Sequence, residues 1–419
     1  MREHLNENIQ ENLSFWKAFI KWMVCAAVVG VVCGLIGTAF HFAVDYASEA
    51  RAHNPWLLYL LPVAGLIIVA CYRLCGMKHD KGTNLVILSI RTKQKTPIVM
   101  APLIFLGTVL THLCGGSSGR EGAALQIGGS VGTFLGKGFR LNEKDLHVMT
   151  MCGMSALFAA LFGTPITATV FSLEVISVGV LYYAAFLPCV LSALIASDIA
   201  MLFGIAPTTF PVGLIPTFSF PLLLKVLIIA LLCALCSMVF AQSMHAASHL
   251  YEKLFKNAYV RVVVGAVLVV ALSLLVGTRD YNGAGMDVIL RAFAGQARPW
   301  DFALKILFTA LTLGAGFKGG EIVPTFFIGA TLGCVLGNLL GMPAGFAAAI
   351  GLLCMFCGVV NCPLATIILS VELFGAEGLA FFAIACAVSY LMSGYYSLYS
   401  GQKILYSKLS TEFINLNAK

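Results

Sequence analysis

The sequence contains few charged residues. Only 11% of its 419 residues are Asp, Glu, Lys or Arg, and 59% are hydrophobic. A soluble globular protein carries about 25% charged residues. A soluble chain of this length would need more charged side chains to cover its surface with water-facing groups. Most of the surface must therefore face lipid, and we expect one integral membrane unit rather than a set of soluble domains.

Several other features are missing. The chain does not open with a basic segment followed by an apolar stretch, so it predicts no cleavable signal peptide; residues 1–18 instead predict a short amphipathic cytosolic segment. The 14 cysteines lie mostly in apolar stretches, and the C-x-x-C pairs Cys233/Cys236 and Cys354/Cys357 have no further Cys or His pair nearby. We therefore expect packing residues here, and no disulfide, metal site or cofactor.

Two function classes find no support in the sequence. An intramembrane enzyme would need a nucleophile beside a base, or a His-Glu-x-x-His metal motif. The histidines in apolar regions, His41, His112, His245 and His249, are scattered instead. A signalling receptor would need a sizeable soluble domain to carry the signal. We expect neither an enzyme nor a receptor.

The net charge of +7 does not indicate nucleic-acid binding, because the basic residues cluster in short loops. Such loops are cytoplasmic by the positive-inside rule of membrane proteins. The clusters are Arg73/Lys78/Lys81, Arg91/Lys93/Lys95, Lys137/Arg140/Lys144 and Lys253/Lys256/Arg261.

Long apolar runs alternate with shorter apolar pieces that Gly and Pro interrupt. The short pieces fall below the roughly 20 residues needed to cross the hydrocarbon core. Broken helices at membrane depth are tolerated only where protein or a cavity surrounds them, which indicates the interior of a transporter or channel. The long runs lie near Ile20–Phe42, Trp56–Cys75, Leu222–His245, Val260–Val276, Phe346–Val360 and Leu379–Met392, and the short pieces are Asn84–Ile90, Glu121–Leu135, Pro165–Ile176 and Pro324–Leu340.

Two segments of the first half recur in the second half. Residues 163–175 match residues 361–373, and residues 119–132 match residues 320–333, in the same order. Glycine-interrupted short helices at corresponding positions of two halves indicate an ion site at the repeat interface. The first match aligns the pairs Pro165/Pro363, Ser172/Ser370 and Glu174/Glu372. We expect Glu174 and Glu372 to have a structural role, bonded within the protein or facing a polar crevice.

The most specific motif reads Gly-Gly-Ser-Ser-Gly-Arg-Glu-Gly at residues 115–122 and opens an apolar helix. Glycines leave backbone N–H groups unshielded, and a helix N-terminus adds partial positive charge, so this turn attracts an anion without a trapping counter-charge. Glu121 lies in the same field. Its carboxylate can fill the anion position and leave it when protonated, as an anion–proton exchanger requires. The structural alternative is a helix-terminal carboxylate stabilised by the dipole.

Two further glycine turns precede short apolar helices. Thr83 and Asn84 follow Gly82 and offer hydroxyl, amide and backbone donors, although by themselves they fit an ordinary helix N-cap better. In the turn at residues 314–324, Lys318 either attracts anions or extends to water. Glu321 is an unusual charge at a helix start, and either caps the helix or takes part in ion or proton transfer.

Two Leu-Tyr-Ser triplets near the end of the chain carry Tyr399 and Tyr406. A phenol O–H there could donate to a bound anion, although membrane tyrosines are more often interfacial anchors. Tyr399 is the better candidate, because it follows Gly394, where the last long span ends, and can sit at the start of a terminal helix. Tyr406 would lie about two turns further along that helix.

Together, these motifs resemble the CLC family of anion channels and anion/proton antiporters, over roughly residues 20–410. Residues 119–122 look like the family's GREGP-type element, with Ala123 where proline is usual. Glu121 would then be the external gating glutamate. The glycine-rich turn before Pro324 looks like the element that begins the filter helix of the second half. The family's anion-coordinating tyrosine lies in a Leu-Tyr-Ser setting, which both triplets satisfy.

The resemblance implies an all-α polytopic membrane protein, with two inverted-topology repeats whose broken helices meet at a mid-membrane anion site. The expected divisions are a cytoplasmic segment at 1–18, repeat one at 19–205, a linker at 206–220, repeat two at 221–410 and a tail at 411–419. The resemblance also implies a homodimer with an independent pore in each subunit. Its expected location is the lipid bilayer of the cell membrane, in a bacterium the inner membrane.

Three departures from chloride-type members point to one branch of the family. Residues 82–86 read Gly-Thr-Asn-Leu-Val where those members carry Gly-Ser-Gly-Ile-Pro, so Thr83 replaces the usual serine. Val175 stands near the place of an internal proton-transfer glutamate, and a valine cannot relay a proton. Glu321 and Ile322 replace a usually apolar pair. All three departures resemble the bacterial fluoride-exporting branch.

The resemblance therefore implies a fluoride/proton antiporter that exports cytosolic fluoride by using the inward proton gradient. Glu121 and Glu321 would carry gating and proton coupling, and Glu121 itself would swing towards the cytosol because Val175 cannot carry the proton. The same-family alternative is a chloride/proton exchanger or chloride channel. It would be favoured if a Glu121→Ala variant passed chloride as readily as fluoride. The expected anion-binding residues are Gly82, Thr83, Asn84, Gly119, Arg120, Gly122, Ile322 and Tyr399 or Tyr406.

Overall fold

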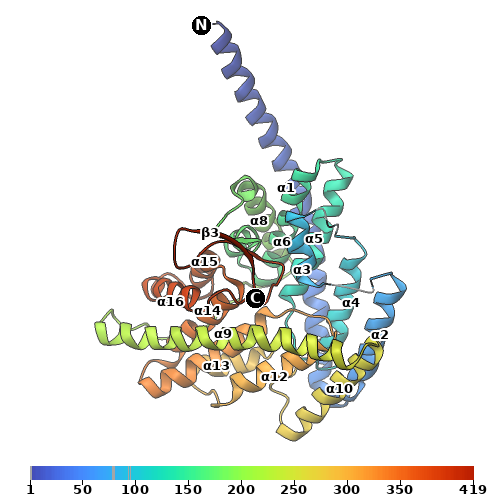
Figure 1. The fold of residues 1–419 in the computed structure, drawn as a ribbon, viewed down its shortest axis with the longest axis vertical. Helices are drawn as coiled ribbons and strands as arrows, with labels where there is room; N and C mark the ends of the chain where they lie inside the picture. Colours follow the sequence, from blue (N-terminus) through green and yellow to red (C-terminus); the bar gives the residue numbers. More distant parts are fainter. Residues whose placement is uncertain (1, 78–80, 93, 95) are drawn as a thin grey trace.

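The computed structural model describes residues 2–77, 81–92, 94 and 96–419, and its regular structure is almost entirely helical (Figure 1). Lys78, Lys93 and Lys95 of the predicted basic loops lie outside the described residues. The helices of the first half are α1 (Arg2–His53), η1 (Pro55–Leu60), α2 (Leu61–Leu74), α3 (Thr83–Arg91), α4 (Met100–Leu113), α5 (Glu121–Gly138), α6 (Glu143–Phe162), α7 (Pro165–Glu174), η2 (Tyr183–Ala185) and α8 (Phe186–Leu202). Those of the second half are α9 (Phe220–Leu254), α10 (Ala258–Val276), α11 (Met286–Phe293), α12 (Asp301–Gly314), α13 (Ile322–Leu340), α14 (Ala344–Val360), α15 (Pro363–Phe374) and α16 (Leu379–Met392).

The predicted apolar runs and short pieces fall in helices. Within the described part of the chain, 7 helical stretches are long and apolar enough to cross a membrane. The expected cytosolic segment and first span form one continuous helix, α1, whose N-terminal part projects from the body (Figure 1). The sequence analysis missed α4, α6, α8, α11 and α12. Of these, α6 begins with the polar residues Glu143, Lys144 and Asp145, which hide its apolar remainder.

Glycines bring α5 and α6 into backbone contact, and α13 and α14 in the same way. A Cβ added to Gly128 would lie 2.1 Å from the carbonyl oxygen of Gly153. A Cβ added to Gly329 would lie 2.4 Å from that of Gly351. The two filter helices, α5 and α13, therefore pack equivalently in both halves, as the match between residues 119–132 and 320–333 predicts. The expectation that the piece Pro324–Leu340 is too short to cross the membrane is wrong, because α13 is one of the 7 stretches long enough to do so. Small residues at such crossings permit close approach of membrane helices.

Residues that the sequence match aligns also bond across the molecule. The carboxylate of Glu174 accepts two backbone N–H groups at the start of α15, at 3.2 and 2.9 Å. Reciprocally, Glu372 accepts two N–H groups at the start of α7, at 3.0 and 2.9 Å. Each carboxylate accepts hydrogen bonds from helix N-terminal N–H groups that would otherwise be unpaired. Its negative charge also interacts favourably with the dipole of the helix that it caps. The predicted structural role of both residues is therefore reciprocal capping: each glutamate binds the start of the helix that carries the other.

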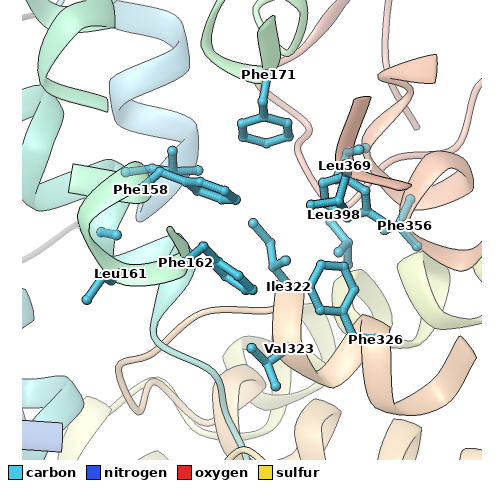
Figure 2. Packing of buried hydrophobic residues seen from close by; sticks show 14 of the residues in the cluster. Phe158, Leu161, Phe162, Phe171, Ile322, Val323, Phe326, Phe356, Leu369 and Leu398 are labelled. Atoms are coloured by element: carbon cyan, nitrogen blue, oxygen red, sulfur yellow. The ribbon is translucent and has the colours of Figure 1, made fainter. Parts of the chain in front are cut away.

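A closed ring of buried phenylalanines joins the two halves (Figure 2). Successive ring centroids lie between 5.2 and 5.8 Å apart, and Ile322 lies among the rings. Each buried aromatic side chain removes a large apolar area, and adjacent rings attract one another further. The ring consists of Phe158 and Phe162 from α6, Phe171 from α7, Phe326 from α13 and Phe356 from α14.

The predicted terminal helix after Gly394 is wrong. Residues 393–402 follow an irregular path, and the chain then forms two strands, β2 (Lys403–Tyr406) and β3 (Phe413–Asn417). Strand β2 pairs in parallel with β1 (Ser177–Val178) and antiparallel with β3. Because β1 immediately follows the end of α7, this small sheet ties the C-terminal segment to the first half.

Candidate functional site

Glu121 begins α5 and is only 1% exposed. Its carboxylate turns back onto the start of the helix, where the backbone N–H of Arg120 donates to it at 3.0 Å. The N–H groups of Glu121 itself and of Val323, in the first turn of α13, donate to it as well. The carboxylate therefore fills the point where the N-termini of α5 and α13 meet. Unpaired N–H groups and partial positive charge make this point favourable for an anion.

Glycines allow these two helix N-termini to meet. The N–H of Gly119 donates to the carbonyl of Gly320 at 2.7 Å, and the N–H of Gly320 donates back at 2.7 Å. A Cβ on Gly320 would lie 2.4 Å from the nitrogen of Gly122, so no larger residue fits there. Gly119 and Gly122, both predicted anion-site residues, thus shape the backbone of the site.

The start of α3 reaches the same place. Gly82 is the N-cap of α3 and adopts a φ of +58°, a conformation that favours glycine. Thr83 is 4% exposed, and its hydroxyl donates to the carbonyl of Gly122 at 3.3 Å. The N-cap interpretation of Thr83 is therefore wrong, because its side chain bonds to α5 and not to its own helix.

Glu321 is the N-cap residue of α13 and makes no side-chain capping bond. Its Oε2 atom is buried and has no hydrogen-bond partner among the described residues. That atom lies 2.7 Å from the position of a Cβ on Gly122, and the Glu321 carboxylate interacts electrostatically with Glu121. The Glu321 side chain thus makes no capping bond to α13 among the described residues, and its part in ion or proton transfer stays a prediction.

The structure separates the two candidate tyrosines. Tyr399 is 1% exposed, its hydroxyl has no hydrogen-bond partner in the described part of the chain, and it lies within electrostatic reach of Glu321 and Glu121. Tyr406 lies in β2, is 43% exposed and packs its ring against Phe413. Tyr399 thus joins the buried cluster, and Tyr406 does not.

Asn84 holds the segment that carries Tyr399. Its side-chain oxygen accepts the backbone N–H of Gly401 at 2.8 Å, and the guanidinium of Arg91 donates to the Gly401 carbonyl. On the other side, the N–H of Leu398 donates to the carbonyl of Val359 at 2.9 Å. Tyr399 is therefore fixed between α3 and the end of α14, and the side-chain oxygen of Asn84 serves this attachment.

Arg120 directs its side chain away from the centre of the site. Its Nη1 donates to Asp45 at 2.8 Å, and the second oxygen of Asp45 lies 2.8 Å from His41 Nε2. The Nε atom of Arg120 remains 3.7 Å from Glu121. Arg120 thus supplies a backbone N–H to the site and shares its full charge with Asp45.

Two cavities reach the cluster. One of about 690 Å³, which we call the outer vestibule, is lined by Glu121, Arg120 and Val323 among others. The other, of about 970 Å³, is the inner vestibule and is lined by Glu321, Gly82 and basic residues of the loops that the positive-inside rule places in the cytoplasm. Lys318 also lines the inner vestibule and lies 4.3 Å from the ring of Tyr72. The two carboxylates therefore border different vestibules.

Val175 caps the C-terminal end of α7 and is fully buried. Its carbonyl accepts the side-chain amide of Gln402 at 3.0 Å, and the same amide nitrogen donates to Val360 at 2.8 Å. Val175 is thus surrounded by apolar atoms and a hydrogen-bonded amide, and it has no titratable group of its own.

Sequence analysis missed two residues of this region. Asp45 anchors Arg120 from α1, and nothing in the sequence around it indicates this contact. Gln126 lies one turn beyond Gly122 on α5 and donates to Thr83. Its signal was a polar residue in a short apolar helix at membrane depth, which is costly unless it has a function or a partner.

Known proteins resemble this chain in sequence and in fold. Residues 64–394 match the family model of the voltage gated chloride channels. The chain belongs to the CLC family. It is 37% identical to the chloride/fluoride channel protein of Pseudomonas syringae pv. tomato, over 95% of this chain and 90% of that protein. It is also 24% identical to the H(+)/Cl(-) exchange transporter ClcA of Yersinia pestis, over 84% of this chain and 80% of ClcA.

Solved structures of the CLC family share the fold. A CLC-type fluoride/proton antiporter superposes with a TM-score of 0.88 at 34% identity, covering 92% of this chain and 98% of that one. A slow cyanobacterial Cl-/H+ antiporter gives a TM-score of 0.75 at 19% identity, covering 89% and 94%. The membership and the likeness in fold confirm the predicted all-α CLC architecture with apolar membrane spans.

Proposed function

We propose that this CLC protein is a fluoride/proton antiporter that exports cytosolic fluoride by using the inward proton gradient. One observation carries the proposal: the Glu121 carboxylate itself lies where the N-termini of α5 and α13 converge, and it borders the outer vestibule. The N–H groups that hold this carboxylate are those that would hold an anion. Carboxylate and anion therefore compete for one position.

Protonation decides the competition. The ionised carboxylate of Glu121 accepts the backbone N–H groups, whereas the neutral acid is a weaker acceptor and carries no charge to hold at the helix N-termini. A proton that arrives through the outer vestibule releases Glu121 and opens the position to fluoride. Because Val175 offers no proton acceptor, Glu121 carries the proton inward itself and passes it to the inner vestibule beside Glu321. Fluoride moves outward in the same cycle.

The remaining predicted residues have different roles in the site. Gly82, Gly119 and Gly122 allow three helix N-termini to approach, Thr83 and Tyr399 supply hydroxyls, and Asn84 positions Tyr399. Ile322 supplies apolar walls at the first residue of α13. Arg120 contributes a backbone N–H, and its charge is partly neutralised by Asp45. The anion is held by dipoles and hydrogen bonds, which lets it leave again.

Two further assignments follow the family resemblance. We propose two repeats at 19–205 and 221–410, separated by a linker at 206–220 that contains no helix until Phe220 begins α9. We also propose a homodimer in the bacterial inner membrane, with a complete pathway in each subunit. One chain by itself supplies α3, α5, α13 and the segment around Tyr399.

Flux measurements test the proposed function. Purified protein in liposomes should release fluoride down its gradient and move protons in the opposite direction, with little chloride movement under an equal gradient. Equal or faster chloride release would instead assign a chloride exchanger or channel, with Thr83 acting like the usual serine. The name of the Pseudomonas relative covers both anions, so both must be measured in one preparation.

A further inference from the structure

Gln126 is a buried polar residue that the proposed transport cycle does not use. It lies on α5, is 3% exposed and lines the inner vestibule together with Gly82 and Glu321. Its Nε2 atom donates to the Thr83 hydroxyl oxygen at 3.2 Å and to the Gly122 carbonyl at 3.2 Å. The side chain is thus held against the cytosolic edge of the anion site.

These bonds fix which way the amide points. The carbonyl of Gly122 can only accept a hydrogen bond, so the atom facing it must be the amide nitrogen of Gln126. The amide oxygen therefore faces away from Gly122. Oε1 is buried and has no hydrogen-bond partner within the described part of the chain. A buried acceptor left unpaired is costly, so a donor must reach it in some step of the cycle.

An anion cannot be that donor, because it offers no hydrogen. The Thr83 hydroxyl already donates to the carbonyl of Gly122. The other nearby groups that can offer an O–H are protonated Glu321 and Tyr399, whose Oε2 and hydroxyl atoms also lack partners among the described residues. Glu321 is the closer fit. Its Oε2 and the Thr83 hydroxyl lie 2.7 and 3.5 Å from one point, the position of a Cβ on Gly122. Gln126 bonds to both Thr83 and Gly122, so the three side chains surround this glycine.

We propose that Gln126 is a positioning residue that accepts a hydrogen bond from the protonated carboxyl of Glu321 and thereby sets the proton step of transport. The inference rests on the proposed function. The neutral acid donates to Oε1, whereas the ionised carboxylate presents a second acceptor to it and is repelled towards the inner vestibule. Gln126 thus distinguishes the two protonation states of Glu321 without titrating itself.

Other charged and titratable groups also act on Glu321. Glu121 of α5 repels its charge, and Tyr399 lies within electrostatic reach. The further groups that line the inner vestibule are Tyr72, Arg73, Lys81, Glu252, Lys256, Arg261 and Lys318. Their effect is common to wild type and Gln126 variants, so a difference between these proteins isolates the amide.

The test is the pH dependence of fluoride efflux from liposomes, with proton movement recorded in parallel. Gln126→Leu removes the acceptor at nearly constant volume. The midpoint of the efflux–pH profile should move about 0.7–1 units to lower pH, equivalent to a fivefold to tenfold loss of the protonated form, the size expected for one buried hydrogen bond. Protons moved per fluoride should fall as well. Gln296→Leu, at an exposed loop position, is the matched control and should leave both unchanged.

A second background locates the effect at Glu321. In Glu321→Gln the side chain no longer titrates, so adding Gln126→Leu should cause no further shift of the midpoint. An unchanged midpoint in Gln126→Leu, or the same shift with and without Glu321→Gln, would overturn the role of Gln126. A different result would overturn the proposed function itself: a wild-type protein that moves no protons in the direction opposite to fluoride. Size-exclusion profiles of each variant in detergent exclude misfolding as the cause.

Discussion

The substitution Gly128→Ala tests whether backbone contact between α5 and α6 holds the filter helix in place. The new Cβ would lie 2.1 Å from the Gly153 carbonyl oxygen, and real Cβ atoms do not come within 3.0 Å of such atoms. The helices must therefore separate by about 0.9 Å or distort locally. The obstructing atoms belong to a helix backbone and cannot rotate away as a side chain can. Overpacking a well-packed site costs about 1–3 kcal/mol, and we expect the upper half of that range here.

Gly138→Ala is the matched control on the same helix. Gly138 is the last residue of α5, and a Cβ there meets nothing within 4 Å. Alanine at an unhindered helix position is neutral or stabilises by about 0.5–1 kcal/mol. Gly329→Ala repeats the clash in the second half, at 2.4 Å from the Gly351 carbonyl.

The assay is unfolding in detergent by heat or denaturant, with fluoride efflux from liposomes measured on the same preparations. Gly128→Ala and Gly329→Ala should lower the unfolding midpoint and the efflux rate, because α5 and α13 carry the N-termini that form the anion site. Equal stability of Gly128→Ala and Gly138→Ala would refute the close helix packing described here.

Three further changes have defined outcomes. Tyr399→Phe should lower fluoride efflux several-fold, because it removes a hydroxyl from the buried cluster, whereas Tyr406→Phe on the exposed strand should leave efflux near wild type in the same assay. Glu174→Gln leaves one oxygen for two N–H groups at the start of α15 and should lower the free energy of unfolding in detergent by about 1–2 kcal/mol. Burial lowers the pKa of Lys408, in the C-terminal segment, to about 8. The unfolded chain therefore holds this proton more strongly, so the stability of wild type relative to Lys408→Met should rise between about pH 8 and 10.5, by at most roughly 3 kcal/mol. A stability difference that stays flat or falls over this range would contradict the burial of this ammonium group.

The sequence predicted those features that depend on local pattern or on internal repetition. Apolar runs such as Leu222–His245 correctly predicted membrane-spanning helices, because length and hydropathy are enough to identify such a helix. The repeat match identified Glu174 and Glu372 as a pair, and the structure shows each capping the helix that carries the other. The glycine-rich turn at residues 115–122 does open a helix, at Glu121.

Features set by distant contacts could not be predicted. Tyr399 and Tyr406 share the same local sequence, but distant contacts separate them. Tyr406 lies in β2, which pairs with Ser177–Val178, more than two hundred residues earlier. Tyr399 is held by the bonds of Gly401 to Asn84 and of Leu398 to Val359 and is buried. The terminal helix was predicted from adjacency to the last span, and strand pairing overrode it. The charge of Arg120 is balanced by Asp45 on α1, a contact that no local pattern indicates.

The sequence shows Gln126 as a polar residue in an apolar helix, but it does not show the hydrogen-bond partners of this side chain. Its meaning depends on which atoms face Thr83 and Gly122, and on the oxygen left over. Hydrogen-bond satisfaction is a property of the assembled site, so composition and spacing cannot give it.

The most direct test of the central claim is fluoride-driven proton pumping by Glu121→Gln in liposomes, compared with wild type. The account predicts that, in wild type, fluoride flowing down its gradient drives protons in the opposite direction. The variant, whose residue 121 cannot titrate, should move no protons. Proton pumping that persists in Glu121→Gln would contradict the claim that one carboxylate both occupies the anion position and carries the proton.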